Sequence, residues 1–397
     1  MDIYQKIYTD RGLDIEPKIL SKIIQDATKK AKSKYKELNP PKLLSEKLYI
    51  HACIRQAIIK DILLNRKNRY PPSEYKNSLD LYLAFSPEVR KKLREEINNA
   101  AIDQRSCIWD KYKIDYKKVE KAFTGLTIQR NIWAQREGFK TWLYKKLIHY
   151  QIPLKDYKRL INNIHYLISF CQEQLNKMVL TDHLTYSEFY KPCYICLSDS
   201  FPFRNIDEVK KKVFEKYKIL KKYKDKIEIK FESRSSASYE ADKDVFEICI
   251  SKNENFRHQS LLLIHELLHV VDYLESFKEG FLPADKGEYY QEKKVLEMIM
   301  PFFRKNYPLF YPNMFSEFLR LFLTAFFEIE VYKNPNQNLS KLYAKAYNIC
   351  YPDAKQKRNR SWILDENIFD YPLSTLPHVV AQSEVILKLI NKSKTLH

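Results

Sequence analysis

Apolar residues recur at helical spacing along most of this 397-residue chain. Residues 1 to about 190 read as almost wholly helical, and Thr141 to Met178 is one of their amphipathic stretches. Helical spacing returns from Leu296 onward, with interruptions near Pro308 and Pro312. The pattern therefore predicts a mainly α protein.

A different pattern separates these two helical regions. The segments Lys226 to Glu232 (KIEIKFE) and Val245 to Ser251 (VFEICIS) alternate apolar and polar residues and are bounded by polar, turn-forming residues. Such period-two alternation is typical of half-buried strands. We therefore expect a helical N-terminal region over residues 1–190 and a second domain, mainly helical with a small β-sheet, over residues 200–397.

Positive charge is in excess over the whole sequence. The 69 Lys and Arg residues against 50 Asp and Glu residues give a formal charge of +19. Such an excess favours encounters with anionic partners, which include nucleic acid, membrane surfaces and acidic peptides. The lysines are dispersed in short runs such as Lys210–Lys212, so solvated helix faces are favoured over a dedicated nucleic-acid groove. Nucleic acid is kept as a less favoured partner.

Composition gives no support to several other classes. With five Gly residues and no Gly-rich phosphate loop, no nucleotide partner is expected. No apolar run is long enough for a membrane span, and the first residues lack the apolar core of a secretory signal. Seven irregularly spaced Cys predict no disulfide framework, and the pair Cys193 and Cys196 reads as part of a loop. We expect a cytoplasmic protein, with export as an effector without a cleavable signal peptide as the alternative.

The pentapeptide His-Glu-Leu-Leu-His at residues 265–269 is the strongest chemical signal in the sequence. It lies in the run Ser260 to Leu274, which has no Gly or Pro and is predicted to be a helix. Residues four apart share a helix face, so His265 and His269 can bind one Zn²⁺ while Glu266 projects toward water on the metal. A random chain with nine His shows this pattern only about one time in a hundred, which favours a zinc hydrolase helix over two packing histidines.

A catalytic zinc takes three protein ligands, and no further His follows until His378, so a carboxylate is expected on the next helix. On a helical wheel Glu292 lies in the middle of the apolar face, Glu288 about 40° to one side, and Glu297 about 140° away among basic residues. A carboxylate in an apolar stripe is costly unless a cation compensates its charge. Glu292 is therefore the preferred third ligand, Glu288 the second choice, and a salt-bridged or helix-end role for Glu292 the alternative.

Residues Ser235 to Ile390 resemble the thimet oligopeptidase and oligoendopeptidase F family of zinc metallopeptidases. The resemblance includes the His-Glu-x-x-His helix after a strand, and a Glu 23 residues after the second His. It also includes the segment Phe318 to Asn348, FLRLFLTAFFEIEVYKNPNQNLSKLYAKAYN, and Pro377-His378 in LPHVVAQSEVILKLI. The resemblance implies a helical zincin-type metallopeptidase with a small β-sheet beside the metal-binding helix.

The resemblance also implies roles for individual residues. His265, His269 and Glu292 would hold Zn²⁺, Glu266 would act as general base, and His378 would stabilise the oxyanion. Two features differ from the family. Leu268 stands where members usually have Gly, and no Tyr follows Tyr371, so the C-terminal tyrosines of the family have no counterpart.

A second comparison concerns the lethal-factor type of toxin peptidase, whose helix continuation resembles His269-Val270-Val271-Asp272. That comparison would place the third ligand further downstream, at Glu317. The function expected is zinc-dependent hydrolysis of peptide bonds in oligopeptides or in a protein substrate. The alternatives are a lethal-factor-like effector that cuts one specific protein, and a non-catalytic helical binding protein with a vestigial zinc site.

Overall fold

The computed structural model describes most of the chain, and its described residues are 4–5, 7, 15–38, 42–69, 80–100, 104–178, 203–232, 235–252, 256–303, 310–352, 361–365, 368–369 and 371–394. The chain divides into two compact units, and each unit combines two separate segments, Met1–Tyr70 with Ser198–Tyr307 and Pro71–Leu197 with Pro308–His397. This arrangement differs from the consecutive division near residue 190 expected from the sequence. The physical reason is that the first helices pack with the segment that carries the sheet. Cys193 and Cys196 lie outside the described residues.

The first unit contains a helical hairpin, a small sheet and the helices around it. Its elements are α2 (Pro17–Glu37), α3 (Glu46–Arg69), α11 (Ile206–Lys216), α12 (Lys218–Lys222), β1 (Ile227–Glu232), β2 (Ser236–Glu240), β3 (Val245–Ser251), α13 (Phe256–Glu279), α14 (Pro283–Lys286) and α15 (Glu288–Phe303). The two strands predicted from alternation are β1 and β3. The strand β2 was not predicted.

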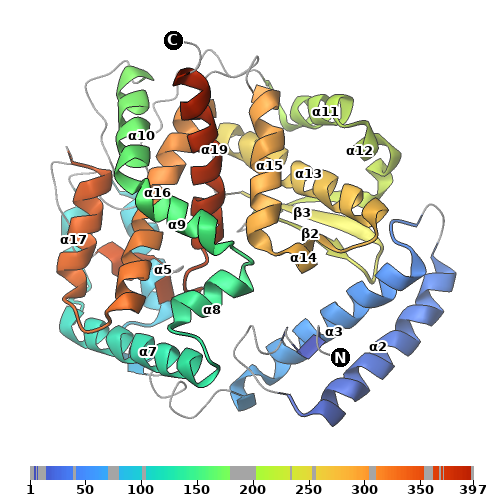
Figure 1. The fold of residues 1–397 in the computed structure, drawn as a ribbon, viewed down its shortest axis with the longest axis horizontal. Coiled ribbons are helices and arrows are strands. Elements are labelled where there is room, and N and C mark those ends of the chain that lie inside the picture. Colours follow the sequence, from blue (N-terminus) through green and yellow to red (C-terminus); the bar gives the residue numbers. More distant parts are fainter. Residues whose placement is uncertain are drawn as a thin grey trace. The chain divides into compact units, whose positions relative to one another are not determined.

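The sheet has the strand order β1-β3-β2, with β1 parallel and β2 antiparallel to the central strand β3. On β3 the side chains of Phe246, Ile248 and Ile250 are fully buried, as the alternating pattern predicts. α13 packs on β2 and β3 (Figure 1). The ring of Phe246 stacks on that of Phe277 in α13 at a centroid distance of 5.9 Å and meets Tyr273 edge-on at 5.7 Å. The sheet therefore fixes the helix that carries the His-Glu-Leu-Leu-His sequence.

The hairpin of α2 and α3 is attached to the rest of this unit by polar contacts. Buried Asp244, which follows β2, accepts hydrogen bonds from the Tyr239 hydroxyl (2.8 Å), the Lys226 ammonium (3.0 Å) and the backbone N–H of Leu43 (3.3 Å). Its φ of 54° is in the left-handed region, which Asp adopts more readily than most residues. This carboxylate joins the start of α3 to the sheet.

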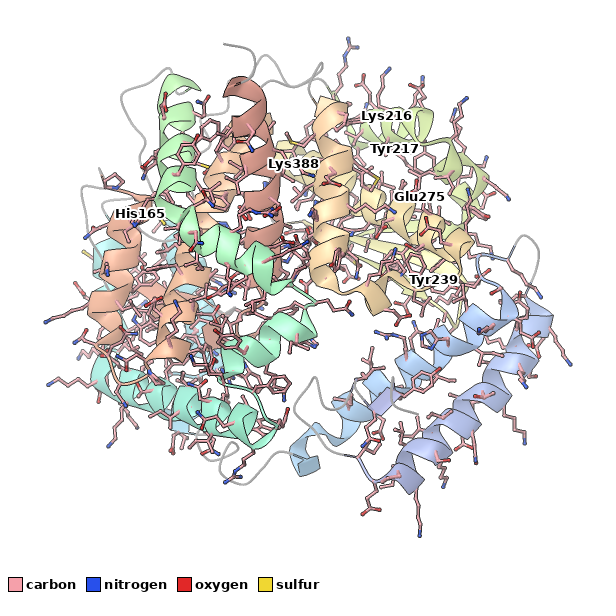
Figure 2. All side chains as sticks on the ribbon, in the orientation of Figure 1. His165, Lys216, Tyr217, Tyr239, Glu275 and Lys388 are labelled. Carbon is pink, nitrogen blue, oxygen red and sulfur yellow. The ribbon has the colours of Figure 1, made fainter. Side chains whose placement is uncertain are left out.

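On the other side of the same unit, α11 and α12 pack on α13. Figure 2 labels Lys216 and Tyr217, which lie at the junction of α11 and α12. The Tyr217 hydroxyl donates a hydrogen bond of 3.1 Å to the carbonyl of Met298, and the Lys216 ammonium lies 5.2 Å from the centre of the Phe302 ring. Met298 and Phe302 belong to α15, so α15 contacts both α13 and the junction of α11 and α12.

The second unit is helical throughout its described residues. Its elements are α5 (Pro87–Asn99), α6 (Arg105–Lys111), α7 (Tyr116–Arg136), α8 (Trp142–His149), α9 (Leu154–Asn162), α10 (Ile164–Met178), α16 (Phe310–Lys333), α17 (Leu339–Cys350) and α19 (Leu376–Lys394). α16 packs against α7, α8, α10, α17 and α19. The ring of Trp362 lies between those of Phe327 (5.5 Å) and Phe369 (5.6 Å) in the core of this unit.

The predicted fold class, mainly α with a small β-sheet beside the His265 helix, is confirmed. Two details differ from the sequence expectation. Thr141 to Met178 forms three helices. The first ends at His149, two residues before Gln151 with its left-handed φ of 53°, and Pro153 then caps the start of the second, which ends at Asn162. Pro312 does not interrupt α16 but lies in its first turn, where the missing N–H costs no helical hydrogen bond. None of the described helices combines the length and apolar character that a membrane crossing requires.

Candidate metal centre

α13 presents His265 and His269 on one face because it runs for 24 residues without Gly or Pro. The helix ends at Gly280, whose φ of 86° is open to glycine but strained for other residues. The N–H of Gly280 bonds to the carbonyl of Phe277 at 3.2 Å, and the N–H of Phe281 bonds to that of Ser276 at 3.1 Å. This is the Schellman pattern of helix termination. His265 and His269 therefore lie more than two turns inside a well-capped helix.

The third candidate ligand comes from α15, which packs directly on α13. The turn between α14 and α15 uses Gly287 at a φ of 83°. On α15 the side chains of Val295, Leu296 and Ile299 are buried, and Glu292 lies among them with only 7% of its surface exposed. The apolar face that the helical wheel predicted for α15, with Glu292 in its middle, is therefore the face that is buried in the structure.

The structure brings His265, His269 and Glu292 together. The two imidazole Nε2 atoms are 3.1 Å apart. The Glu292 carboxylate oxygens lie 3.2 Å from Nε2 of His269 and 3.6 Å from Nε2 of His265. Each residue offers one ligand atom, and all these atoms lie within 4.8 Å of one another.

These separations fit a zinc ion. Ligands placed tetrahedrally at about 2.0–2.1 Å from Zn²⁺ lie roughly 3.3 Å from one another. The three measured distances of 3.1, 3.2 and 3.6 Å surround that value. Two imidazole nitrogens and one carboxylate oxygen are also a donor set that catalytic zinc sites use, with a fourth position left for water or substrate. His265, His269 and Glu292 are therefore the residues that would hold the metal.

The electrostatic field at this centre favours positive charge. Burial alone would lower the pKa of His269, but the carboxylates of Glu292, Glu266 and Asp272 outweigh this effect and raise the pKa above its ordinary value. Among the three carboxylates, Glu292 raises the pKa of His269 the most, both through its charge and through its hydrogen bond to the imidazole ring. The same carboxylates that favour a proton on this imidazole would favour a divalent cation beside it.

Glu266 lies next to the metal-binding face and is not one of the three grouped donors. On the helical wheel it is about 80° from the midpoint between His265 and His269. Its side chain is buried, with 7% exposure, and its charge contributes to the raised pKa of His269. A carboxylate beside the metal ligands but outside their set has the placement that a general base requires.

Leu268 is fully buried and lies about 80° from the same midpoint, on the side opposite Glu266. Its side chain is therefore part of the packed core of α13 rather than of the metal-binding face. The difference from the family at this position leaves the three donor atoms in place.

Sequence reasoning did not single out Asp272 as a residue that supports the candidate metal centre. Asp272, one turn after His269, is buried and forms an ion pair of 2.7 Å with Lys294 of α15. Lys294 also pairs with the half-exposed Glu275 at 3.0 Å. The Asp272–Lys294 pair joins the two helices that carry the ligands, close to His269 and two residues after Glu292. The spacing of Asp272 from His269 was visible in the sequence, but its partner was not.

The alternative ligands lie elsewhere. Glu288 is half-buried in the first turn of α15, and Glu297 is exposed. Glu317, on α16 of the second unit, pairs with Arg320 of its own helix, whose Nε lies 2.9 Å from the carboxylate. His378 is half-buried in the first turn of α19 in the second unit. Among the described residues, neither these carboxylates nor His378 join a group of possible metal ligands.

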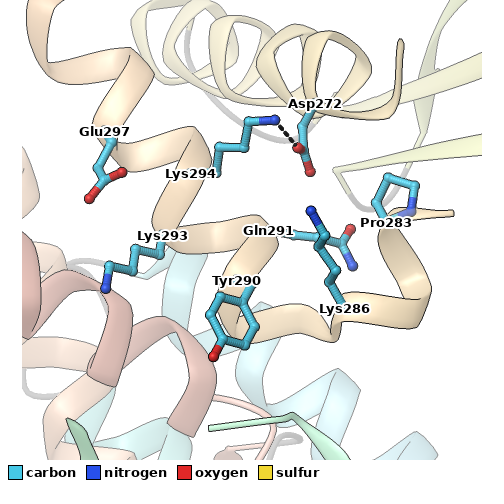
Figure 3. Close-up of a pocket in the computed structure, with 8 residues that line it drawn as sticks. All are labelled: Asp272, Pro283, Lys286, Tyr290, Gln291, Lys293, Lys294 and Glu297. Carbon is cyan, nitrogen blue, oxygen red and sulfur yellow. Dashed lines mark ion pairs between the residues drawn. The ribbon is translucent and has the colours of Figure 1, made fainter. Parts of the chain in front are cut away.

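A depression of about 260 Å³ is lined by residues of α13, α14 and α15 (Figure 3), and none of His265, His269 and Glu292 is among them. Its lining includes Asp272, Lys286, Tyr290, Lys293, Lys294 and Glu297. The lining residues of α15 fall about 100–200° around the helix from Glu292. The depression is thus formed by the face of α15 that points away from the ligands.

A second group of possible ligands in the described chain is Glu232, Glu247 and Cys249 on the sheet. Glu247 is already paired with the Lys230 ammonium. Burial first, and then the charges of Glu232 and Glu247, raise the pKa of the Cys249 thiol, which keeps it protonated. Unlike the first group, this one contains no imidazole, and one of its carboxylates already has a basic partner.

The sequence matches no protein-family model and no curated protein. Two solved structures are similar in fold, each with 13% sequence identity to this chain. One is a PZ peptidase A with an inhibitor, at a TM-score of 0.52 over 84% of this chain and 68% of that chain. The other is described as an oligoendopeptidase F, at a TM-score of 0.49 over 70% of this chain. The present chain spans 56% of the length of the oligoendopeptidase F structure. The likeness to PZ peptidase A shows that the two chains share a fold.

Proposed function

We propose that this protein is a zinc-dependent metallopeptidase that hydrolyses peptide bonds in oligopeptides or in a protein substrate. The observation that carries the proposal is the convergence of the His265, His269 and Glu292 donors at separations of 3.1–3.6 Å, beside the buried carboxylate of Glu266. The shared fold with a structure named as a peptidase supports the same reaction class.

Each residue has one role in the proposed reaction. When bound, Zn²⁺ supplies Lewis-acid polarisation of the scissile carbonyl and a nucleophile at neutral pH. The Glu266 carboxylate accepts a proton from the attacking water and passes it to the nitrogen of the leaving amine. The products are a carboxylic acid and an amine, so one water is consumed for each bond broken.

Asp272 is proposed to orient the site rather than to react. Its carboxylate raises the basicity of His269 and, through Lys294, holds α13 against α15. His378 is proposed, on the family resemblance alone, to donate a hydrogen bond to the oxyanion that forms as the carbonyl is attacked. Removing one such donor commonly lowers kcat by about 10²–10³.

The test is turnover of a quenched fluorescent peptide library by the zinc-loaded full chain. We expect cleavage that a chelator abolishes and that added Zn²⁺ restores. The substitution Glu266→Gln should abolish cleavage and leave zinc binding intact, because Gln cannot accept the proton. Glu275→Gln, which changes a half-exposed carboxylate on the same helix, is the matched control and should remain active.

Full activity in Glu266→Gln would refute the proposed role of this residue. Stoichiometric zinc with no cleavage by the unaltered chain would instead favour the non-catalytic binding protein. Cleavage of one folded protein but not of the peptide library would favour an effector peptidase with a single target.

A further inference from the structure

The helix α2 carries a row of lysines that the proposed peptidase function does not use. The row follows the i, i+4, i+7 spacing of one helix face from residue 18 to residue 36, and every position is Lys except Gln25. We call the lysines of this row the lysine ridge: Lys18, Lys22, Lys29, Lys32 and Lys36. All five side chains are exposed. Because a helix rises 1.5 Å per residue, the ridge is about 27 Å long.

The ridge lies opposite the face by which α2 is held in the fold. On the helical wheel its five lysines fall within about 80° of arc, and buried Leu20, Ala27 and Ala31 are centred about 200° from Lys18. That buried face packs on α3, where it meets Ile54, Ile58 and other apolar residues. Figure 1 shows α2 running alongside α3. Because the buried face of α2 is turned to α3, the ridge lies on the side of α2 that faces away from α3.

Among the residues that the structure describes, none neutralises the charge of the ridge. Over the part of the chain that the structure describes, no ridge lysine takes part in an ion pair. The acidic residues within α2 are Asp26 and Glu37, which lie about 80–100° around the helix from the centre of the ridge. Further around the same flank, about 120–160° from the centre of the ridge, α2 also carries the exposed Lys30 and Lys34. The ridge is therefore a line of five lysines with two carboxylates beside it on one flank.

The shape of this charge pattern distinguishes between anionic partners. A helix that enters a nucleic-acid groove has phosphates on both flanks, so Asp26 and Glu37 would face negative charge. A flat surface, by contrast, contacts a helix along one line of its outer side. Residues about 90° around the helix from that line, such as Asp26 and Glu37, do not face the surface. Long lysine side chains can reach such a surface while the helix stays packed on its partner. A line of lysines on the outer side of a docked helix thus fits a flat anionic layer.

We propose that the lysine ridge of α2 docks this protein on an anionic lipid surface. The apolar face of α2 packs on α3, and Ile19 is the one large apolar side chain exposed on this described helix, so the attachment is electrostatic rather than by insertion into the acyl layer. Each lysine near an acidic lipid surface strengthens binding by about fivefold, and salt weakens binding as the Debye length shortens. This inference is independent of the peptidase proposal.

The test is co-sedimentation of the full chain with phosphatidylcholine vesicles that contain about one third phosphatidylserine, at about 50 mM and about 500 mM salt. The ridge variant replaces Lys18, Lys22, Lys29, Lys32 and Lys36 by Gln, whose helix propensity is close to that of Lys. The matched control variant replaces five other exposed lysines of the same unit by Gln. These are Lys211, Lys218, Lys221, Lys224 and Lys252. Both variants lose the same charge, and thermal unfolding followed by circular dichroism confirms that each is folded.

We expect the unaltered chain to bind acidic vesicles at low salt and to release them at high salt, without binding pure phosphatidylcholine. The ridge variant should lose at least about a hundredfold in affinity, and the control variant less than about tenfold. Three outcomes would overturn the proposal. They are an equal loss in both variants, no vesicle binding by the unaltered chain at low salt, and ridge-dependent binding of duplex DNA or RNA without binding of vesicles.

Discussion

The carboxylate of Glu292 lies 3.2 Å from Nε2 of His269, although the two residues are on different helices and 23 positions apart in the sequence. Glu292 is buried among apolar side chains of α15, and His269 is held on α13 by the packing of that helix on the sheet. Two packed helices thus place a negative oxygen and a nitrogen lone pair at the spacing of zinc ligands.

The ion pair between Asp272 and Lys294 should tune the affinity for zinc. Asp272→Asn removes a carboxylate that raises the basicity of His269 and loosens the join between α13 and α15. We expect zinc affinity to fall by roughly tenfold, the usual effect of losing such a supporting carboxylate. Competition with a fluorescent chelator measures it.

The control for this prediction is Glu275→Gln, because Glu275 shares Lys294 but its side chain is 45% exposed, against 7% for Asp272. Its effect on zinc affinity should be less than about threefold, as for an exposed ion pair. Equal losses in Asp272→Asn and Glu275→Gln would mean that Lys294, and not the carboxylate near His269, supports the site.

A second prediction concerns acid stability. Burial alone would raise the pKa of Asp285, but the hydrogen bond with His51 and the charge of Arg55, 2.7 Å away, outweigh it and lower the pKa. A carboxyl whose pKa is lower in the folded than in the unfolded state adds stability above its unfolded value near 3.8, and this stability is lost as pH falls through the folded value. Urea unfolding between about pH 3 and pH 7 should therefore show a smaller loss of stability on acidification in Asp285→Asn. The exposed Asp225→Asn should keep the acid dependence of the unaltered chain, and an unchanged acid dependence in Asp285→Asn would contradict this account.

The buried carboxyl of Glu328 should behave in the opposite way. Complete burial in the second unit raises its pKa well above the ordinary value, more than the hydrogen bond from the N–H of Leu373 (2.8 Å) lowers it. A carboxyl with a raised pKa makes its most favourable contribution to the free energy of unfolding below its ordinary pKa of about 4.5. This contribution falls as pH rises toward the pKa of the folded state. Glu328→Gln, which is neutral at every pH, should remove this fall and leave the protein at least as stable at pH 8.

Thermal unfolding of Glu328→Gln at two pH values checks this prediction. Its control is Glu330→Gln, a half-buried neighbour on the same helix that pairs with Lys333 at 2.8 Å. A large loss of stability at pH 8 in Glu328→Gln would show that the charged carboxylate is needed.

The sequence was informative where one residue pattern determines one local structure. Alternation predicted β1 and β3, and the helical phase distinguished buried Glu292 from exposed Glu297. Both are local consequences of periodicity. The strand β2 was not predicted, because Ser236–Glu240 is short and polar and becomes a strand by pairing with β3.

Contacts between distant segments were beyond a single sequence. Nothing in the sequence pairs Asp272 with Lys294, since each is an ordinary surface-type residue on its own helix. The division into interleaved units has the same origin. The hairpin of α2 and α3 packs with a segment that begins at Ser198, through contacts such as Leu43 to Asp244, which are 201 positions apart. The helical periodicity of residues 1–190 does not indicate which later segment the hairpin packs against.

The most direct measurement of the central claim is the zinc content of the purified chain by elemental analysis. The protein is first stripped with a chelator and then reloaded with one equivalent of Zn²⁺. The unaltered chain and Glu297→Gln should each hold one zinc ion, whereas Glu292→Gln should lose at least about a hundredfold in affinity and retain little metal. Full zinc content in Glu292→Gln, or none in the unaltered chain, would contradict the account.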